Sequence, residues 1–306
     1  MRLAIIGAGI TGLYLAWKSA EKGEDVTVFE KREKIGKEAC SGLFSDRILE
    51  FIPQSKNLIK NKIDYTLINF PGKTLKIRFS RPFFVMSHSE LDSLVADLAQ
   101  KAGAKIILNS SALPAGFDRI IGCDGALSQT RKGLGLEDPE FYSGVQGFIQ
   151  KNDSSNYVET WPTKAGFIWK IPRGGEVEYG IMEKPETAKA VFDQFLRKNS
   201  LNLEGIKSAL IPQGLIMPNN PAITLCGDAA GLTKPWSGGG VIWGLTAADL
   251  LLKNFPDFIR YQKELKSLFL PKIIISKLAK SLIYFFGFNL PWALPENYKI
   301  ESDFLI

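Results

Sequence analysis

The feature that most constrains this chain is an apolar run near its N-terminus that leads straight into three spaced glycines. Residues 3–6 are apolar, as a strand buried on both faces requires. Gly7, Gly9 and Gly12 follow at the spacing G-x-G-x-x-G. A helical pattern then begins at Leu13. In a nucleotide-binding turn, the first glycine permits the tight turn, the second admits a pyrophosphate, and the third lets the helix pack close to the strand. The helix N-terminus then offers N–H groups and a positive dipole to the phosphates.

A second apolar run, over residues 25–29, predicts a strand that ends at Glu30. An acid about 20 residues after the glycines accepts hydrogen bonds from an adenosine ribose and disfavours a ribose 2′-phosphate, and so disfavours NADP. The order of strand, turn, helix, strand and acid predicts a Rossmann-like dinucleotide-binding unit. Because no small-residue cleavage site follows the first run, we interpret it as part of this fold and not as a signal peptide.

The composition narrows the chemistry. The chain of 306 residues has one histidine, His88, and three widely separated cysteines, which disfavours a metal site, a Ser-His-Asp triad and a disulfide framework. We therefore expect no metal, a reducing compartment, and chemistry that comes from a bound cofactor. The net charge is +6, and residues 258–290 hold six basic residues against one acid. Such a patch attracts an anionic membrane surface, and no further signal favours nucleic acid.

Two further stretches point to the cofactor. Residues 119–125 predict a strand followed by the turn Asp124-Gly125. Residues 222–226 predict a strand that is followed by Gly227-Asp228-Ala229-Ala230-Gly231, Pro235 and the glycines 238–240. In order and spacing, these stretches resemble the motifs of the FAD-dependent hydroxylase superfamily, whose type member is p-hydroxybenzoate hydroxylase. The resemblance implies FAD as the cofactor, with Asp228 on its ribityl chain and residues 238–241 beside its isoalloxazine. A glycine-rich turn before a helix also presents N–H groups where a reduced flavin carries negative charge.

Within that superfamily, the chain resembles the geranylgeranyl reductases, flavoenzymes that saturate isoprenoid double bonds. Residues 37–42, Lys-Glu-Ala-Cys-Ser-Gly, resemble a Cys-Gly loop of that family near the flavin. Residues 167–172 with their trailing glycines resemble an aromatic-x-Trp-x-Phe-Pro motif that lines a lipid cavity. The resemblance covers roughly residues 1–255 and implies Cys40 as a catalytic residue. The predicted substrate-binding residues are Phe167, Trp169, Pro172 and, beside the flavin-side glycines, Trp236.

The predicted FAD-binding residues lie in these motifs or beside them: Gly7, Gly9, Ile10, Thr11, Gly12, Glu30, Lys31, Ser41, Gly42, His88, Asp124, Gly125, Asp228, Pro235, Gly238, Gly239, Gly240 and Val241. Three positions depart from the family pattern. Ser41 separates the cysteine from the glycine, and Ile171 replaces a phenylalanine. His88 stands where the superfamily generally has an arginine that contacts FAD, so that contact is lost or passes to His88.

The length predicts about two domains, and the scattered motifs predict that the cofactor domain is discontinuous. We assign residues 1–65, 86–135 and 218–255 to an α/β, Rossmann-like FAD-binding domain. Alternating runs in residues 66–85 and 136–217 predict a second, antiparallel-sheet domain that binds substrate. Residues 256–306 are expected to form a C-terminal helical segment.

An amphipathic helix is predicted over residues 272–286, with the polar positions on one half of the helical wheel. Those positions are Lys272, Ser276, Lys277, Lys280 and Ser281. Two interpretations stay open: the helix packs on the FAD domain with solvated lysines, or it lies in a membrane interface. A cytoplasmic protein, peripheral at the inner membrane face, is expected. No segment is apolar for long enough to span a bilayer.

The function predicted from these features is an FAD-dependent reductase that saturates carbon–carbon double bonds of isoprenoid chains in lipids. NAD(P)H and ferredoxin both remain open as its electron donor. One alternative is an FAD monooxygenase or halogenase, because residues 167–172 also resemble the Trp-x-Trp-x-Ile-Pro motif of flavin-dependent halogenases. Another is a flavin-bearing protein that binds or senses a lipid without turnover.

Overall fold

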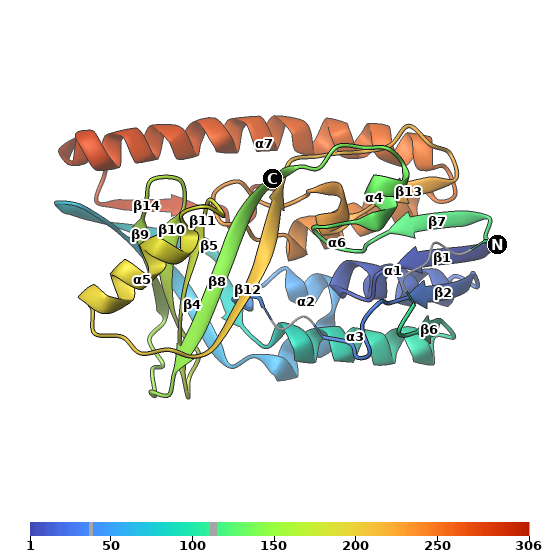
Figure 1. The fold of residues 1–306 in the computed structure, drawn as a ribbon, viewed down its shortest axis with the longest axis horizontal. Coiled ribbons are helices and arrows are strands. Elements are labelled where there is room, and N and C mark those ends of the chain that lie inside the picture. Colours follow the sequence, from blue (N-terminus) through green and yellow to red (C-terminus); the bar gives the residue numbers. More distant parts are fainter. Residues whose placement is uncertain (37–38, 111–114, 306) are drawn as a thin grey trace. The chain divides into compact units, whose positions relative to one another are not determined.

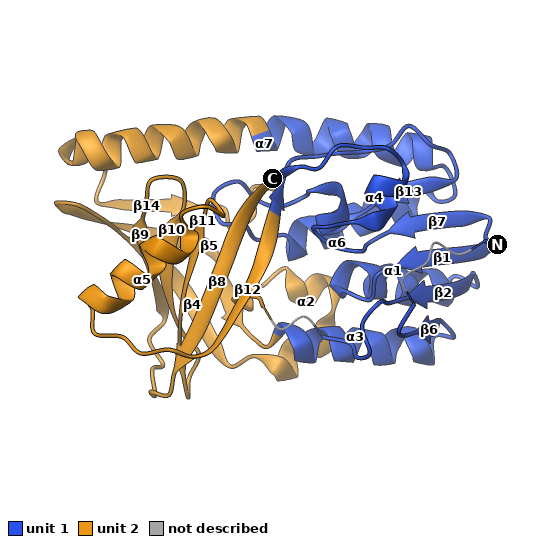
Figure 2. Ribbon diagram, in the orientation of Figure 1, with its two compact units in different colours: residues 1–37, 88–140, 212–273 blue, residues 38–87, 141–211, 274–306 orange. Residues whose placement is uncertain are grey.

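The computed structural model describes residues 1–36, 39–110 and 115–305. The chain divides into two compact units, which Figure 2 shows in different colours. Unit 1 comprises residues 1–37, 88–140 and 212–273, and unit 2 comprises residues 38–87, 141–211 and 274–306. Each unit is assembled from three separate stretches, so neither is formed by one continuous segment.

Unit 1 is built on a five-stranded parallel sheet (Figure 1). Its strand order is β13 (Ile223–Leu225), β7 (Arg119–Gly122), β1 (Arg2–Ile6), β2 (Asp25–Phe29) and β6 (Lys105–Ile107). The apolar residues of the central strand β1 are buried, as a strand covered on both faces requires. Because β1 and β2 are parallel, their carboxyl ends meet at one edge of the sheet, where the Gly7 turn and Glu30 follow.

The helices of unit 1 are α1 (Ile10–Glu21), α3 (His88–Lys101), α4 (Gln129–Gly133), α6 (Val241–Asn254), the 3₁₀ helix η2 (Gly227–Ala230) and the first part of α7 (Phe258–Asn289). Helix α1 packs against both α3 and α6. The hydroxyl of Tyr14 on α1 donates a hydrogen bond to Asp249 Oδ1 on α6, at 2.7 Å. The helical pattern predicted from Leu13 onward corresponds to α1, which follows the glycine turn.

Unit 2 is built on a nine-stranded mixed sheet. The strand order is β12 (Glu204–Gln213), β8 (Glu140–Ile149), β11 (Val177–Glu183), β10 (Phe167–Pro172), β9 (Tyr157–Pro162), β4 (Asn61–Phe70), β5 (Lys73–Val85) and β14 (Asn297–Ile300), with β3 (Leu43–Ser45) paired to β5. The sequence predicts an antiparallel sheet, and most neighbours are antiparallel, but β4 pairs with β9 and β14 pairs with β5 in parallel. Parallel neighbours need long connections, and long stretches of chain separate both of these pairs.

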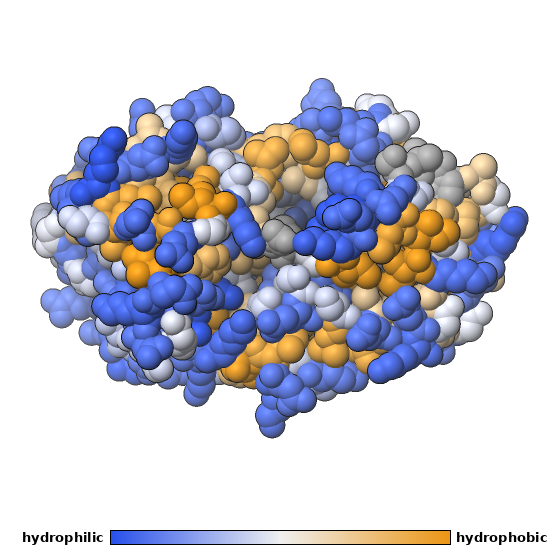
Figure 3. Space-filling view, turned by 60° about the horizontal axis from the view of Figure 1, so that its bottom comes forward, coloured by the Kyte–Doolittle hydropathy of each residue, from blue (hydrophilic) through white to orange (hydrophobic). Residues whose placement is uncertain are grey.

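The two faces of this sheet are both apolar around β10 and β11. On one face, Trp169 and Ile171 pack with Met182 in a buried cluster. On the other face, Ile168 and Ile181 pack against Phe192 of α5 (Ala188–Lys198). The short helices α2 (Ile48–Phe51), η1 (Pro53–Leu58) and η3 (Pro291–Ala293) complete the described elements. Hydrophilic side chains surround separate apolar patches on the molecular face drawn in Figure 3, as is usual for a globular chain.

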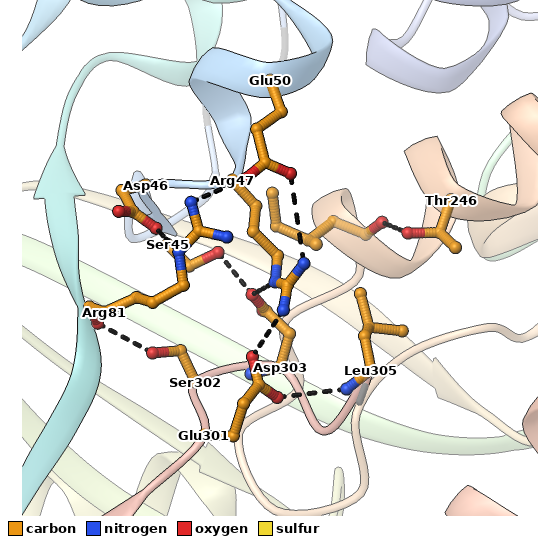
Figure 4. A network of polar contacts seen from close by, with 11 residues as sticks. Ser45, Asp46, Arg47, Glu50, Arg81, Thr246, Glu301, Ser302, Asp303 and Leu305 are labelled. Carbon is orange, nitrogen blue, oxygen red and sulfur yellow. Dashed lines mark hydrogen bonds and ion pairs between the residues drawn. The ribbon is translucent and has the colours of Figure 1, made fainter.

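The sequence-based division and the observed units differ most at residues 38–65 and in the C-terminal segment, which is divided between the units after residue 273. Residues 38–65, assigned by sequence to the FAD domain, lie in unit 2, because β4 pairs with β5. The C-terminal segment is not helical throughout, because β14 joins the same sheet. The residues after β14 form polar contacts with β3, β5 and the segment before α2 (Figure 4). Those contacts join Ser45 to Asp303, Arg47 to Glu301 at 3.0 Å, and Ser302 to the carbonyl of Arg81 at 2.8 Å.

The second part of α7 is oriented differently from the prediction. Ser276 is buried, and Lys280 Nζ donates to the carbonyl of Ala165, in the turn between β9 and β10, at 2.9 Å, so two residues of the predicted polar half face the protein. The large apolar residues of this part are exposed instead: Ile274, Ile275, Leu278, Leu282, Ile283, Phe285 and Phe288. Among the described residues, no helix is long and apolar enough to cross a membrane.

Candidate cofactor and substrate sites

The turn after β1 has the geometry of a phosphate-binding turn. Gly7 has φ +104°, and a Cβ there would lie 2.4 Å from the carbonyl oxygen of Cys123. A Cβ on Gly12 would lie 2.1 Å from the carbonyl oxygen of Gly7. A Cβ on Gly9 would meet nothing within 4 Å, so open space lies beside this backbone. Gly9 is also the N-cap of α1 and provides no side-chain cap, which suits an anion at the helix N-terminus.

Glu30 is held as an ionised acceptor at the end of β2. It is buried, and its Oε2 accepts a hydrogen bond from the backbone N–H of Ala8 at 2.7 Å. Its Oε1 accepts from the backbone N–H and the Nε of Arg32, at 3.0 and 2.9 Å. Burial by itself raises the pKa of the Glu30 carboxyl, but the hydrogen bonds from Arg32 and Ala8 outweigh it and hold the pKa below its usual value. The carboxylate is therefore charged at neutral pH, which makes it a strong acceptor for ribose hydroxyls. Lys31, the next residue, is exposed.

Asp124 has a capping role. Its Oδ1 accepts from Ser128 Oγ at 2.5 Å, and its Oδ2 accepts from the backbone N–H of Thr130 at 3.0 Å. These bonds close the turn through Gly125, which has φ +79°, and lead into α4. The fully buried Arg131 of α4 donates to the carbonyl of Ala229, at 2.8 Å, and so joins the Asp-Gly motif to the Gly-Asp motif. Sequence analysis gave Arg131 no role, since its partner lies 98 residues away.

The Gly-Asp motif forms η2 and the turn that precedes α6. A Cβ on Gly240 would lie 2.7 Å from Asp228 Oδ1, so the Asp228 carboxylate faces the glycines that begin α6. Gly240 is the N-cap of α6, Val241 is its first residue, and no side chain caps it. Gly238 has φ +68°, and Pro235 before it is buried.

Thr11 at the start of α1 packs beside this motif. Cβ atoms on Gly227 and Gly244 would lie 2.9 and 2.7 Å from Thr11 Oγ1. The start of α1, η2 and the start of α6 are thus brought together within unit 1. A carboxylate, two uncapped helix N-termini and the open space at Gly9 fit the ribityl, flavin and pyrophosphate parts of FAD.

Three other predicted residues of unit 1 occupy the following places. Ile10 is buried at the first position of α1. His88 is buried at the start of α3, where its Nε2 lies 3.4 Å from Asp92 Oδ1. Trp236 is partly buried, and its ring centroid lies 5.8 Å from that of the fully buried Trp243. The structure thus brings together the glycine turn, Thr11 and the Gly-Asp motif, while Asp124 acts as a capping residue.

The loop that carries Cys40 belongs to unit 2, and Lys37 and Glu38 of its motif lie outside the described residues. The backbone N–H of Gly42 donates to Cys40 Sγ at 3.4 Å. Gly42 has φ +62°, and a Cβ there would lie 2.0 Å from the carbonyl oxygen of Met86, so this position requires glycine. Gln146 Nε2 donates to the carbonyl of Cys40 at 3.1 Å. The inserted Ser41 offers its carbonyl to Arg173 Nη1, at 2.6 Å.

Trp169 covers a glycine on the neighbouring strand. A Cβ on Gly180 of β11 would lie 2.2 Å from Trp169 Cζ2, so the indole occupies the space that a side chain at this position would need. Phe167, two residues earlier, is partly buried with its ring centroid 5.9 Å from that of Trp169. Pro172 ends β10 and is buried. These aromatic residues form the apolar face of β10 on which the predicted substrate contacts depend.

Glu178 is a buried carboxylate that sequence analysis missed. It is fully buried on β11, where its Oε1 accepts from Trp169 Nε1 at 2.8 Å and its Oε2 from Arg173 Nη1 at 2.9 Å. Burial raises its pKa to about 7, against the opposing effects of Arg173 and Trp169. One signal was present in the sequence. Glu178 and Gly180 are two residues apart on one strand, so both point to the same face of the sheet, and this is the face on which Gly180 lies beside Trp169.

The comparisons with known proteins agree with this geometry. Residues 5–51 match the family model described as an NAD(P)-binding Rossmann-like domain. The digeranylgeranylglycerophospholipid reductase of Methanocaldococcus jannaschii is 22% identical over 286 residues, which cover 78% of this chain and 72% of that protein. A geranylgeranyl bacteriochlorophyll reductase-like protein from Thermoplasma acidophilum has a similar structure, with a TM-score of 0.79, 22% identity, and coverage of 92% of this chain and 86% of that one.

A structure of the halogenase PltM in complex with FAD matches with a TM-score of 0.72 and 14% identity, over 94% of this chain and 77% of that one. These structural likenesses confirm the predicted fold class. The names of the relatives confirm the predicted resemblance to geranylgeranyl reductases. The predictions of an oxidoreductase and of FAD agree with the same comparisons.

Proposed function

We propose that this chain is an FAD-dependent reductase that saturates carbon–carbon double bonds of isoprenoid chains in lipids. One observation carries the proposal: the same chain contains two features. The first is a glycine turn of the kind that binds FAD, and the second is a loop with Cys40 that Arg173 connects to the aromatic strand β10. The curated relatives named digeranylgeranylglycerophospholipid reductase support the same substrate class. The proposal assigns FAD to unit 1 and the prenyl chain to unit 2.

An isolated alkene cannot be polarised by hydrogen bonds, so the protein must position the double bond, exclude water and deliver a proton. Reduced FAD, when bound, supplies the hydride to one alkene carbon. Gly9, Asp228 and the N-terminus of α6 would hold this cofactor, and the apolar face formed by Phe167 and Trp169 would orient the prenyl chain. The thiol of Cys40 delivers the proton to the second carbon, and the thiolate that remains regains a proton from solvent once the saturated chain has left.

The test is an anaerobic single turnover. The flavoprotein is reduced chemically, a digeranylgeranylglycerophospholipid is added, and flavin absorbance is followed together with the mass of the lipid. We expect flavin reoxidation with hydrogens gained in pairs by the lipid, and none with a saturated lipid as control. A flavin that stays reduced beside an unchanged lipid refutes the proposal. Multiple-turnover assays with NAD(P)H and with reduced ferredoxin then identify the electron donor.

A second candidate function is oxygen chemistry, as a monooxygenase or halogenase. It is favoured by the structural likeness to halogenases and by the sequence of β10, which keeps Trp169 and Pro172 of the halogenase-like motif. Phe167 stands where that motif has its first tryptophan. Substrate-stimulated oxygen consumption with a hydroxylated or halogenated product identifies this function. A flavin-bearing lipid-binding protein is the third outcome, and it gives slow flavin reoxidation that no substrate accelerates.

We further propose that the protein is cytoplasmic and reaches its lipid at the inner membrane face, through a strip of exposed apolar residues on α7: Ile274, Ile275, Leu278, Leu282, Ile283, Phe285 and Phe288. Ile275 and Leu278 are 63% and 62% exposed, and the exposed Lys277 lies between them in sequence. An exposed apolar strip that also carries an exposed lysine favours binding to anionic bilayers.

Sedimentation with phosphatidylglycerol vesicles tests this proposal. Leu278→Glu is expected to reduce binding strongly, because it places a charge in the apolar strip. Ile206→Glu is the matched control, since Ile206 is 61% exposed on β12, outside the strip, and its substitution is expected to leave binding unchanged. Equal binding by Leu278→Glu and the unmodified protein contradicts the proposal.

A further inference from the structure

Glu178 is a fully buried acid that takes no part in the proposed reaction as described above. Both of its carboxylate oxygens are engaged, one by the indole N–H of Trp169 at 2.8 Å and one by Arg173 Nη1 at 2.9 Å. These donors come from β10 and from the turn that joins β10 to β11. The strand hairpin therefore fixes the position of the carboxylate.

Arg173 extends this cluster to the loop that carries the thiol. The same Nη1 that binds Glu178 donates to the carbonyl of Ser41 at 2.6 Å, and Nη2 lies 3.5 Å from the carbonyl oxygen of Met86. Its Nε lies 3.4 Å from Glu176 Oε1. One guanidinium thus joins the buried acid on β11 to the cysteine loop at Ser41 and to the backbone of Met86, just after β5.

The loop also holds the sulfur of Cys40 in a polar setting. The Gly42 N–H points at Sγ, and Gln146 fixes the Cys40 carbonyl. A hydrogen bond from a backbone N–H and a nearby guanidinium both favour a thiolate. Of the three cysteines, all within the described residues, Cys40 alone is partly exposed, while Cys123 and Cys226 are buried.

We propose that Glu178 is a positioning residue for Cys40, which through Arg173 anchors the loop and by its own charge keeps the thiol protonated. When Glu178 is ionised, its negative charge offsets Arg173 and disfavours a second negative charge on sulfur. When Glu178 is neutral, Arg173 favours the thiolate. The two acids therefore titrate as a coupled pair, and each makes ionisation of the other harder.

The charges that face Glu178 fix the pH range of this effect. Arg173 lies on the turn, Glu176 beside it on the same turn, and Cys40 on the loop. Burial, with smaller contributions from Cys40 and Glu176, raises the pKa of Glu178 to about 7 against the attraction of Arg173. Glu178 thus becomes negative as the pH rises through neutrality, which is where a cysteine would otherwise begin to ionise.

The consequence for catalysis rests on the proposed function. Saturation of an alkene adds a hydride to one carbon and a proton to the other, so Cys40 must carry its proton when the hydride arrives. Electrons and atoms balance with reduced flavin as the hydride source and the thiol as the proton source. Glu178 acts on this step through Cys40 and Arg173, and does not itself touch the prenyl chain.

Alkylation of Cys40 by iodoacetamide tests the inference in the FAD-loaded, full-length protein. Because only the thiolate reacts, the rate reports its fraction, and mass spectrometry of the Cys40 peptide measures it between pH 6 and pH 9.5. Glu178→Gln keeps the size and the acceptor for Trp169 but removes the charge. We expect its alkylation midpoint to fall by about one pH unit, which is about tenfold more thiolate at neutral pH.

Glu176→Gln is the matched control, because it removes a carboxylate from the same guanidinium at a partly exposed position. It is expected to move the midpoint by less than a third as much. Arg173→Lys supplies a second variant and is expected to move the midpoint in the opposite direction, since the cation then retreats from Ser41. Superimposable profiles for Glu178→Gln and the unmodified protein overturn the inference, as do equal shifts in Glu178→Gln and Glu176→Gln.

Prenyl reduction separates this inference from the proposed function. We expect the alkaline limb of the activity profile of Glu178→Gln to fall about one pH unit earlier, which a merely structural role would not produce. An alkylation shift without any prenyl reduction refutes the proposed reductase and leaves the role of Glu178 standing. Prenyl reduction without an alkylation shift refutes the role of Glu178 alone.

Discussion

The buried carboxylate of Glu178 makes the stability of unit 2 depend on pH with a sign that the structure fixes. Its pKa is about 7 in the folded chain and 4.5 when unperturbed. Between these values the folded state binds more protons than the unfolded state, so stability falls as the pH rises from about 4.5 to 7 and is level above. The difference of about 2.5 units corresponds to about 3 kcal/mol at 1.36 kcal/mol per unit.

Glu178→Gln removes this titration. The difference in unfolding free energy between the variant and the unmodified protein should therefore change by about 3 kcal/mol between pH 4.5 and pH 7, in favour of the variant at the higher pH. Hydrogen exchange of peptides from β10 and β11 across a urea series reports the unit that contains the substitution. Parallel pH dependences for the two proteins refute the reasoning, because they mean that Glu178 has the same proton affinity in both states.

Three further predictions concern unit 1. Gly12→Ala should destabilise it by about 1–3 kcal/mol, because the added Cβ lies 2.1 Å from Gly7 O. Gly9→Ala should leave the urea midpoint unchanged, because its Cβ meets no protein atom, but should weaken FAD binding, because the Cβ enters the space proposed for the pyrophosphate. A lower urea midpoint for Gly9→Ala as well contradicts this distinction. Glu30→Gln should weaken FAD binding by about tenfold in fluorescence titrations, since it removes a charged acceptor, and unchanged affinity counts against the ribose contact. Tyr14→Phe should cost about 1–2 kcal/mol in urea unfolding through the lost bond to Asp249, and an effect near zero shows that bond to be unimportant.

The local features of unit 1 could be predicted from the sequence because short-range chemistry determines them. A positive φ at Gly7 and the close approach at Gly12 both need glycine, and both act within a dozen residues. The parallel order of β1 and β2 follows from the helix between them. The apposition of Thr11 with Gly227 and Gly244 joins residues more than 200 positions apart in the chain, and the sequence did not predict it.

The remaining features depend on partners that are distant in sequence. Arg131 bonds a carbonyl 98 residues away, and no local pattern marks it. The strand β14 pairs with β5, which lies more than 200 residues earlier in the chain. Its four residues are too few to show a strand pattern, so only this distant partner makes them a strand. In α7, the wheel separated apolar from polar residues, but only tertiary contacts such as Lys280 with Ala165 decide which half faces the protein.

The two departures from the reductase pattern in unit 2 are accommodated without any special side-chain chemistry. Ser41 contributes its backbone carbonyl to Arg173, which any residue at this position could offer, so the insertion leaves the anchoring of the loop intact. Ile171 is buried in the cluster with Trp169, where a smaller apolar side chain still fills the core. The motifs that carry the resemblance do not include the acid on the neighbouring strand, Glu178. Because Glu178 accepts from the motif tryptophan and shares a guanidinium with the cysteine loop, it couples the two motifs that carry the resemblance, and its charge determines how they act together.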